Sequence, residues 1–424
     1  MQTRAIDALT GNTLHAHAIT RRRANLRGII RCTPLFGGLV AVWVPLSSCQ
    51  RTVQGATPAE TPVDLAIQAS RVLDPRTGEY SGPMTILVRN GRILELRPTA
   101  AQLPSGAARV LDLRGLTVMP GLIDAHVHLA IGGTVRANAL ADLRAGFTTV
   151  VDLGTVSHRL LRLADSINAG GIPGPRVLAA GIWVGVKGGV CEFTGIGLTG
   201  ATSVFRDRVR QNIQAGAAII KLCVSGWPAE AFAAPERYEM PDSIIAAAVD
   251  EAHLGGKLVV AHDISTGGVR AALAAGIDGF AHAAYLDPSL IEAMRRRAVF
   301  LIPTLASLTA GDTSAAGRGL VSSTAAAHRA GVRLVFGTDS GVLPHGANAQ
   351  EFLSLEGAGL SRLETIRTAT VNAAAALRLS DSLGIIAPGM AADLIAVGGD
   401  PLADLRALQD VRAVVSRGRV VTQP

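Results

Sequence analysis

Lys221 occupies an unusual position in a chain that takes almost all of its other basic residues from arginine. It is one of three lysines and lies within the apolar run of residues 218–224. Burial of an ammonium group is costly, so a lysine in such a run readily loses its proton and becomes reactive. The position of Lys221 therefore indicates chemistry rather than surface charge.

Four histidines and one aspartate lie in apolar segments of the same kind. With Lys221, the candidate ligands are His126, His128, His262, His282 and Asp339. A strand would point His126 and His128, which are two residues apart, to the same side. Imidazole nitrogen suits zinc. A single histidine on an apolar strand is usually a core residue, but this set of six predicts a two-metal hydrolase centre.

The amine of Lys221 would be a ligand only after it had added carbon dioxide, because the resulting carbamate carries two oxygens that can bridge two cations. His262 and His282 would complete the ligands of the second cation, and Asp339 would bind the first. Two cations about 3.5–4 Å apart lower the pKa of a bridging water and polarise a carbonyl. Asp339 would take the proton of the bridging hydroxide and return it to the leaving amine, as general base and acid.

Three further residues are candidates for substrate binding. His345 follows Asp339 in a loop, where it would either hydrogen-bond the substrate or pack the loop. Tyr285 and Trp227 come just after other ligand-bearing segments, and both are expected to line the pocket wall.

Eight short apolar runs alternate with alanine-rich helical stretches after residue 118. The runs are 118–128, 148–153, 177–184, 218–224, 258–264, 279–285, 299–305 and 333–339. This rhythm predicts an α/β fold of the (β/α)8 TIM-barrel class over residues 118–383. Catalytic groups of such barrels gather at the carboxyl ends of the strands, where every candidate ligand falls.

Strand patterns also flank the predicted barrel on both sides. Residues 65–72, 84–88 and 92–96 come before it, with Asn90-Gly91 as a hairpin signal, and residues 393–397, 411–415 and 419–421 follow it. Such strands cannot extend a closed barrel. We expect residues 62–117 and 384–424 to form one small composite β-sandwich domain.

The first 48 residues have the pattern of an export signal. They hold six arginines against one acidic residue, and so contribute most of the formal net charge of +7. The remainder of the chain gives no reason to expect nucleic acid. An apolar stretch at 34–46 is followed by Leu-Ser-Ser-Cys at 46–49, which resembles the lipobox of bacterial lipoproteins, with Cys49 as the acylated residue. The alternative is an uncleaved N-terminal extension.

Residues 49–61 are then expected to be a tether. The basic segment at 21–27 also resembles a twin-arginine signal, so the sequence leaves open whether export is of the Sec or the twin-arginine type. Apart from the acylated Cys49, the exported chain would keep only Cys191 and Cys223. These two residues would form either one disulfide or two buried thiols.

Several motifs resemble the amidohydrolase superfamily. They are Pro-Gly-Leu-Ile-Asp-Ala-His-Val-His at 120–128, Ile-Lys-Leu at 220–222, Val-Ala-His at 260–262, Ala-His at 281–282 and Phe-Gly-Thr-Asp at 336–339, with support from 345–348 and 388–393. The chain is similar to the branch of Xaa-Pro and Xaa-Arg dipeptidases, N-acyl amino-acid hydrolases and imidazolonepropionase-like proteins. This resemblance, over residues 62–424, implies zinc, a carboxylated Lys221 and a homo-oligomer.

The chain departs from these relatives around two ligands. Asp263-Ile264 follows His262 where relatives often have Ala-His, and Ala281 precedes His282 where they often have glutamate. The pocket lining should therefore differ from that of any characterised relative.

We therefore expect a lipid-anchored, periplasm-facing metal-dependent amidohydrolase that cleaves the amide of a dipeptide or an N-acyl amino acid. Its partners would be a small-molecule substrate and, through the anchor alone, a membrane. Phosphotriester or lactone hydrolysis at the same centre is the alternative chemistry. A mononuclear deaminase would not need a carbamate at Lys221, and a non-catalytic scaffold would be expected to lose ligands.

Overall fold

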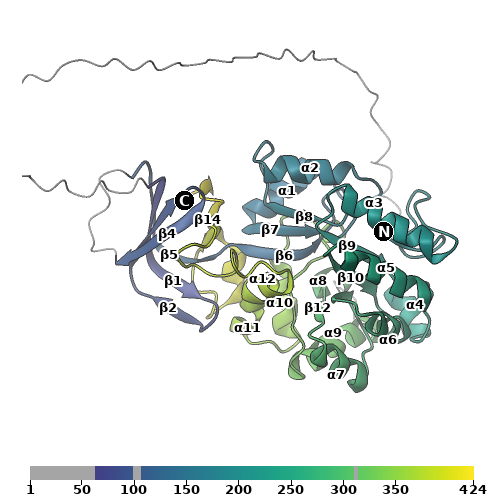
Figure 1. The fold of residues 1–424 in the computed structure, drawn as a ribbon. Helices are drawn as coiled ribbons and strands as arrows, with labels where there is room; N and C mark the ends of the chain where they lie inside the picture. The colour runs from purple at the N-terminus through teal and green to yellow at the C-terminus, as the bar shows by residue number, and fades with distance from the viewer. Residues whose placement is uncertain (1–62, 99–106, 310–313) are drawn as a thin grey trace, which may run out of the picture. The chain divides into compact units, whose positions relative to one another are not determined.

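The computed structural model describes residues 63–98, 107–309 and 314–424 (Figure 1). The predicted export signal (1–48), the lipid site Cys49 and the tether (49–61) lie outside the described residues, so these expectations stay predictions. Within the described part, no helix is both long enough and apolar enough to span a membrane.

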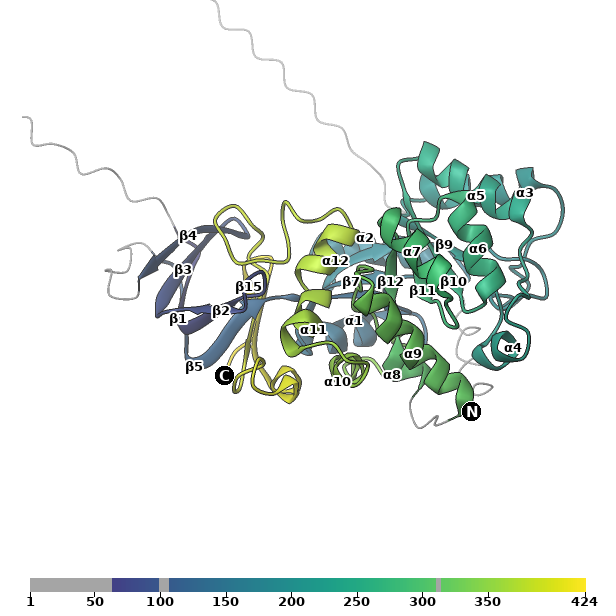
Figure 2. The same ribbon diagram turned by 90° about the horizontal axis from the view of Figure 1, so that it is seen from below.

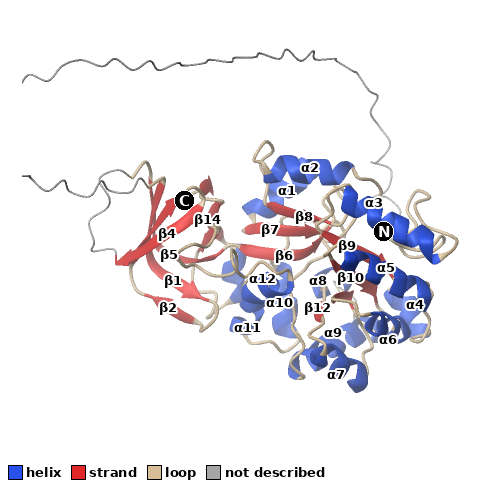
Figure 3. Cartoon of the chain, in the orientation of Figure 1, coloured by secondary structure: helices blue, strands red, loops and turns tan. Residues whose placement is uncertain are grey.

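One mixed sheet joins the two ends of the described chain (Figure 3). Its strands follow the order β15-β14-β13-β5-β1-β3-β4, and β2 pairs with β1. Strands β1 and β5 are parallel, whereas the other neighbours are antiparallel. The strands are β1 (Leu65–Asp74), β2 (Glu79–Ser81), β3 (Met84–Arg89), β4 (Arg92–Pro98), β5 (Val110–Pro120), β13 (Leu394–Val397), β14 (Val411–Ser416) and β15 (Arg419–Thr422).

The turns of this sheet have the residue types that their backbone requires. Asn90 and Gly91 connect β3 to β4 with φ of 50° and 74°. Arg417 and Gly418 connect β14 to β15 with φ of 52° and 73°. Two successive positive φ values favour asparagine and glycine in a two-residue hairpin. The Asn-Gly hairpin predicted from the sequence is thus confirmed.

Seven shorter strands form two parallel sheets, ordered β6-β7-β8 and β12-β11-β10-β9. The fold is therefore α/β with parallel strands, as predicted. The strands are β6 (Leu122–Val127), β7 (Phe147–Asp152), β8 (Arg176–Ala179), β9 (Ile219–Cys223), β10 (Leu258–Asp263), β11 (Gly279–His282) and β12 (Phe300–Ile302).

Helices connect these strands and lie outside them (Figures 1 and 2). Their inner faces bury apolar side chains, such as Leu161 and Ile167 of α2. The helices are α1 (Val135–Arg144), α2 (Arg159–Asn168), α3 (Thr202–Gln214), α4 (Pro228–Ala233), α5 (Asp242–Leu254), α6 (Thr266–Ala275), α7 (Pro288–Arg296), α8 (Leu305–Leu308), α9 (Ala315–Arg329), α10 (Gln350–Gly357), α11 (Arg362–Thr368), α12 (Val371–Ala376) and the 3-10 helix η3 (Leu405–Gln409).

The predicted first strand, residues 118–128, is divided between two sheets. Its first part belongs to β5 of the mixed sheet, and its second part is β6 of the parallel sheet. Gly121 lies at the junction, where a β-carbon would come within 2.2 Å of the Thr148 hydroxyl oxygen. The close approach of β7 therefore requires glycine at this position.

The predicted eighth strand, residues 333–339, is not a regular strand but contacts two of them. Leu301 of β12 donates its N–H to the Arg333 carbonyl (3.0 Å), and Val335 donates to the Leu301 carbonyl (2.9 Å). On the other side, Ala125 of β6 donates to the Phe336 carbonyl (2.9 Å). The segment thus alternates between two neighbours, which leaves no continuous ladder with either.

Backbone hydrogen bonds also connect β8 to β9. Ala218 donates its N–H to the Ala179 carbonyl (2.9 Å), and Val184 donates to the Lys221 carbonyl (3.1 Å). The two parallel sheets are therefore linked at both pairs of edges. As a result, the carboxyl ends of β6 and β9 to β11, and the end of the segment 333–339, face a common region.

Candidate metal centre

The six predicted ligands are all buried in the structure. His126 and His128 lie at the end of β6, Lys221 lies in β9, His262 in β10 and His282 at the end of β11. Asp339 ends the irregular segment that follows α9. The exposed fraction is 8% or less for each of them. An inward-facing group of four imidazoles, one amine and one carboxylate requires a compensating interaction.

Three of these side chains form a tight triangle of ligand atoms. The Nε2 atoms of His126 and His128 are 3.3 Å apart. The Asp339 Oδ1 atom is 3.3 Å from the first and 3.2 Å from the second. A tetrahedral cation with ligands about 2.0–2.1 Å away would separate those ligands by about 3.3 Å. The triangle therefore has the dimensions of one face of a tetrahedral metal site.

His282 and His262 extend this group. Ligand atoms of His126, His282 and Asp339 all lie within 4.8 Å of one another, so these three residues could hold a metal ion. The ring of His262 is 4.6 Å from that of His282, measured between centroids. The spacing of His262 and His282 in the sequence does not by itself predict that their rings lie this close.

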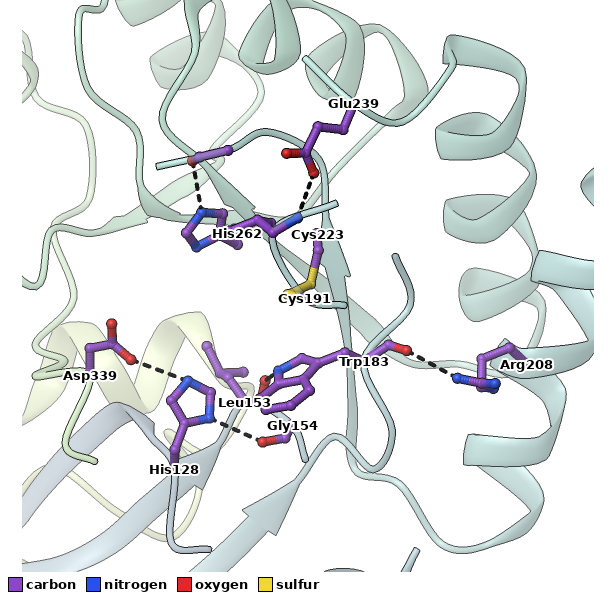
Figure 4. The surroundings of a disulfide bond; sticks show 12 residues. His128, Leu153, Gly154, Trp183, Cys191, Arg208, Cys223, Glu239, His262 and Asp339 are labelled. Carbon is purple, nitrogen blue, oxygen red and sulfur yellow. Dashed lines mark hydrogen bonds and ion pairs between the residues drawn. A yellow bond between two sulfur atoms is a disulfide. The ribbon is translucent and has the colours of Figure 1, made fainter. Parts of the chain in front are cut away.

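Three of the four histidines have one ring nitrogen oriented by a hydrogen bond, whereas Nδ1 of His126 is buried without a partner. His128 Nδ1 lies 3.0 Å from the Gly154 carbonyl (Figure 4). His282 Nδ1 lies 2.6 Å from the Thr304 hydroxyl, and His262 Nε2 lies 3.2 Å from the Gly226 carbonyl. Each contact leaves the other ring nitrogen available, which is the arrangement found around metal-binding imidazoles.

His126, His262 and His282 are held in their neutral form. Burial lowers the pKa of His262 to about 4, with Lys221 as a second cause. Burial also lowers the pKa of His126 and of His282 well below the usual value. A neutral imidazole keeps the lone pair that a cation needs.

Lys221 is the least satisfied member of the group. Its Nζ is buried and has no hydrogen-bond partner. Burial lowers the pKa of Lys221 to about 7, although Asp339 opposes the shift. A substantial fraction of the amine is thus neutral near pH 7. A neutral, unpaired amine is the form that can add carbon dioxide.

The carboxyl group of Asp339 stays ionised. Burial raises its pKa, but the neighbouring histidines His126, His128 and His282 lower it, and the net pKa lies well below the usual range. The backbone of Asp339 is in the left-handed region with φ of 56°, and that of His282 has φ of 79°. Such conformations cost about 1–3 kcal/mol each for residues other than glycine and concentrate at functional sites.

Asp124 is a supporting residue that our sequence analysis did not single out. This fully buried carboxylate accepts hydrogen bonds from the His126 N–H (3.1 Å), the Thr338 N–H (3.1 Å), the Thr338 hydroxyl (2.7 Å) and the Asn348 side chain (2.8 Å). It therefore ties the strand of His126 to the segment of Asp339. Its place two residues before His126 was the available signal.

Glu351 is a second supporting residue that was missed. Its buried carboxylate accepts hydrogen bonds from the N–H groups of Leu305 (3.0 Å) and Ala306 (2.6 Å). These residues directly follow Thr304, which contacts His282. Sequence carried no signal for this contact, because Glu351 is distant from Thr304 along the chain.

The three predicted substrate-binding residues have different surroundings. The Trp227 ring lies 5.9 Å from the His262 ring and is 37% exposed. Tyr285 follows His282, and its ring lies 5.7 Å from that of Phe232. Both nitrogens of His345 have protein partners, Asp142 at 2.9 Å and the His128 carbonyl at 3.2 Å. Of these three residues, Trp227 is the one whose ring is exposed and also lies beside a proposed metal-binding residue, His262.

The two cysteines of the catalytic region form a disulfide, which decides the alternative that the sequence left open. Cys191 and Cys223 are bonded, and their Cα atoms are 6.1 Å apart. Figure 4 shows the disulfide between His262 and Trp183. Cys223 is two residues after Lys221, so the bond attaches the loop after β8 to the ligand-bearing strand β9. A bonded sulfur is not a thiolate ligand.

Comparison with known proteins agrees with this geometry. Residues 117–421 match the family model described as the amidohydrolase family. The chain belongs to the amidohydrolase family. Members of this family usually use a divalent metal, and the chain is a hydrolase of carbon–nitrogen bonds.

Individual relatives extend over most of the chain. Ochratoxinase from Aspergillus niger is 28% identical over 389 residues, which cover 77% of this chain and 80% of the relative. A Bifidobacterium longum protein provisionally identified as a prolidase superimposes with a TM-score of 0.77 and 33% identity, over 86% of this chain and 96% of its own. A Xaa-Pro dipeptidase with bound methionine gives a TM-score of 0.77 and 25% identity, over 84% and 99%.

Proposed function

We propose that this amidohydrolase cleaves the amide bond of a dipeptide or an N-acyl amino acid and that it uses two divalent cations. The observation that carries the proposal is the triangle of His126, His128 and Asp339, whose atoms are 3.2–3.3 Å apart beside the unpartnered Lys221 amine. Donors at this spacing fit a cation, and the neutral amine fits a carbamate.

The proposed ligand set would be shared between two cations. His126, His128 and Asp339 would hold the first, and His262 with His282 would hold the second. Carboxylated Lys221 would help to hold both cations. Imidazole and carboxylate donors favour Zn2+. When bound, the cations would lower the pKa of water and polarise the scissile carbonyl.

Asp339 would carry the proton in this reaction. Its carboxylate is held ionised beside His126 and His128, so it can accept the proton of the attacking water. The same carboxyl group would then donate that proton to the nitrogen of the leaving amine. Trp227 would lie along the apolar part of the substrate, next to His262.

The substrate class rests on the names of the relatives and on this aromatic wall. Ochratoxinase, a Xaa-Pro dipeptidase and a provisional prolidase are among the proteins that the chain resembles. Phosphotriester or lactone hydrolysis would use the same centre. A mononuclear deaminase would need His126, His128 and Asp339 but no carbamate.

The Asp339→Asn variant tests the proposed reaction. We expect it to lower hydrolysis of dipeptides and N-acyl amino acids by at least about a thousandfold, because a proton-transfer group is lost. Thermal unfolding should be little changed, and the matched variant Asp278→Asn should keep full activity. Full activity in Asp339→Asn would reject the assigned role.

A side-by-side assay with lactones and phosphotriesters separates the alternative chemistries. Preferred turnover of esters would replace the amide proposal with its alternative. Two metal equivalents per chain are expected in elemental analysis, whereas a single equivalent would favour the deaminase.

We further propose that the parallel strands close into a (β/α)8 barrel over residues 118–383, with the mixed sheet as a composite β-sandwich domain. The hydrogen bonds between Ala218 and Ala179 and between Ala125 and Phe336, at the two pairs of sheet edges, support closure.

Export of the chain to the periplasm, with lipid on Cys49, is a separate proposal. The Cys191–Cys223 disulfide supports an oxidising compartment. Intact-mass measurement of the membrane fraction would test the anchor, and a mass without lipid on Cys49 would reject it.

A further inference from the structure

A cavity of about 900 Å³ lies between the mixed sheet and the ends of two helices. One wall comes from the turns at 90–92 and 416–421 of the sheet, and the other from the end of α1 and from residues 168–176 after α2. Residues 144 and 168–176 immediately precede β7 and β8. The cavity therefore opens at the amino ends of the parallel strands, opposite to the metal ligands at their carboxyl ends.

Positive charge is concentrated in this cavity. Its lining includes five arginines, which are Arg92, Arg144, Arg176, Arg417 and Arg419. Asp64 is the acidic residue of the lining, and its carboxylate accepts the Asn90 N–H (2.6 Å). Asp393 lies behind, where it accepts the Arg417 N–H (2.5 Å) and lies 3.3 Å from Arg176. The five guanidinium groups of the lining thus have two carboxylates close by, Asp64 in the lining and Asp393 behind it, so positive charge is in excess.

Several donors in this cavity lack an acceptor. The Nε of Arg176 is buried and has no hydrogen-bond partner. Arg144 and Arg419 are exposed, and within the described part of the chain their side chains show no hydrogen bond or ion pair. These donors are available to a ligand.

Arg417 gives the cavity a rigid wall. It donates to the backbone carbonyls of Asn168 (2.8 Å), Gly174 (2.9 Å) and Ile167 (3.2 Å). Burial lowers the pKa of Arg417, and the neighbouring Arg176 and Arg419 contribute to the same shift. The arginines are thus close enough to repel one another.

We propose that this cavity binds the phosphate group of a small, multiply charged anion. One guanidinium group can donate two parallel hydrogen bonds to two oxygens of a phosphate. Several guanidinium groups around one site favour a ligand with more than one negative charge. The volume exceeds that of a single phosphate, so the ligand carries either a second phosphate or an organic group. The anion would relieve the repulsion between the arginines that line the cavity.

Calorimetric titration of the full chain with pyrophosphate tests this proposal. The double variant Arg144→Gln/Arg419→Gln should bind at least about tenfold more weakly, since two charge-assisted contacts are lost. The control Arg136→Gln/Arg162→Gln removes the same charge from exposed positions of α1 and α2 outside the cavity and should bind like the wild type. Amide hydrolysis should be unchanged in both variants.

A second arm distinguishes a free phosphate compound from a lipid headgroup. Vesicles of phosphatidylglycerol are sedimented with each variant in the presence and absence of pyrophosphate. Loss of vesicle binding in the cavity variant alone, with competition by pyrophosphate, would assign the phosphate to a lipid; loss of pyrophosphate binding alone would assign it to a soluble ligand. No binding in either arm, or equal binding by the cavity and control variants, would overturn the proposal.

Discussion

The apolar core of the mixed sheet and the metal centre are similarly buried but are built from opposite kinds of residue. Ile67, Ile86 and Leu113 of the sheet are apolar and fully or almost fully enclosed. At the metal centre, Lys221 and His126 are just as enclosed, although both are ionisable. The sheet follows the local rules of stability, whereas the centre violates them at considerable cost. The difference indicates that the apolar parts stabilise a fold whose polar centre is selected for chemistry.

Lys221→Met should give the largest contrast between the two regions. Activity should fall by more than about a hundredfold, since loss of outer-shell partners alone typically costs 10–100-fold. The free energy of unfolding of the metal-free variant should be equal to or higher than that of the metal-free wild type. The substitution removes a buried amine that makes no hydrogen bond, so no hydrogen bond is lost. Turnover, metal content and denaturant unfolding measure these effects. Lys257→Met, at a half-buried lysine before β10, is the control, and a destabilised Lys221→Met would contradict the comparison.

Ile67→Ala should have the reverse effect. Removal of this enclosed side chain from β1 should lower the free energy of unfolding by about 2–5 kcal/mol. Activity per folded molecule should be unchanged at low temperature, because the metal ligands lie in other strands. Urea unfolding and turnover test both statements, with the neighbouring half-buried Gln68→Ala as the control. A large loss of turnover in the folded variant would show that the two regions are coupled.

Asp124→Asn should weaken the support of the centre without removing a ligand. The carboxylate accepts four hydrogen bonds, two at each oxygen. The amide nitrogen of asparagine replaces one of these oxygens and cannot accept the two hydrogen bonds made there. We expect a 10- to 100-fold fall in metal affinity or activity, as is typical of groups that orient ligands. Metal titration measures the change, with Asp278→Asn as the matched control. Unaltered metal affinity would mean that packing alone positions His126 and Asp339.

Trp227→Ala should have the smallest effect. Its ring beside His262 would contribute about 1–2 kcal/mol of apolar contact, so KM should rise about five- to thirtyfold. The kcat value should change little, and Trp227→Phe should restore most of the loss. Steady-state kinetics with an apolar dipeptide measure the effect. A large fall in kcat with constant KM would place Trp227 in the reaction rather than in the wall.

Regular patterns made much of the fold predictable. The strand ranges of the sheet agree with β1, β3, β4 and β13 to β15 to within two residues at each end. The eighth predicted strand failed as a regular element, because residues 333–339 bond alternately to β12 and β6. The apolar pattern of a segment indicates that it is buried. It does not show whether the segment forms a continuous hydrogen-bond ladder with one strand or single backbone hydrogen bonds with two strands.

The amino-acid sequence by itself determined the candidate ligands and the turns, because residue type and strand period act locally. It also gave the reason to examine Lys221, a lysine in an apolar run. Only the tertiary structure decided the 3.2–3.3 Å triangle, the Cys191–Cys223 bond and the supporting contacts of Asp124 and Glu351. Each of these joins residues far apart in the chain or depends on side-chain positions, so their distances exist only after the strands have packed.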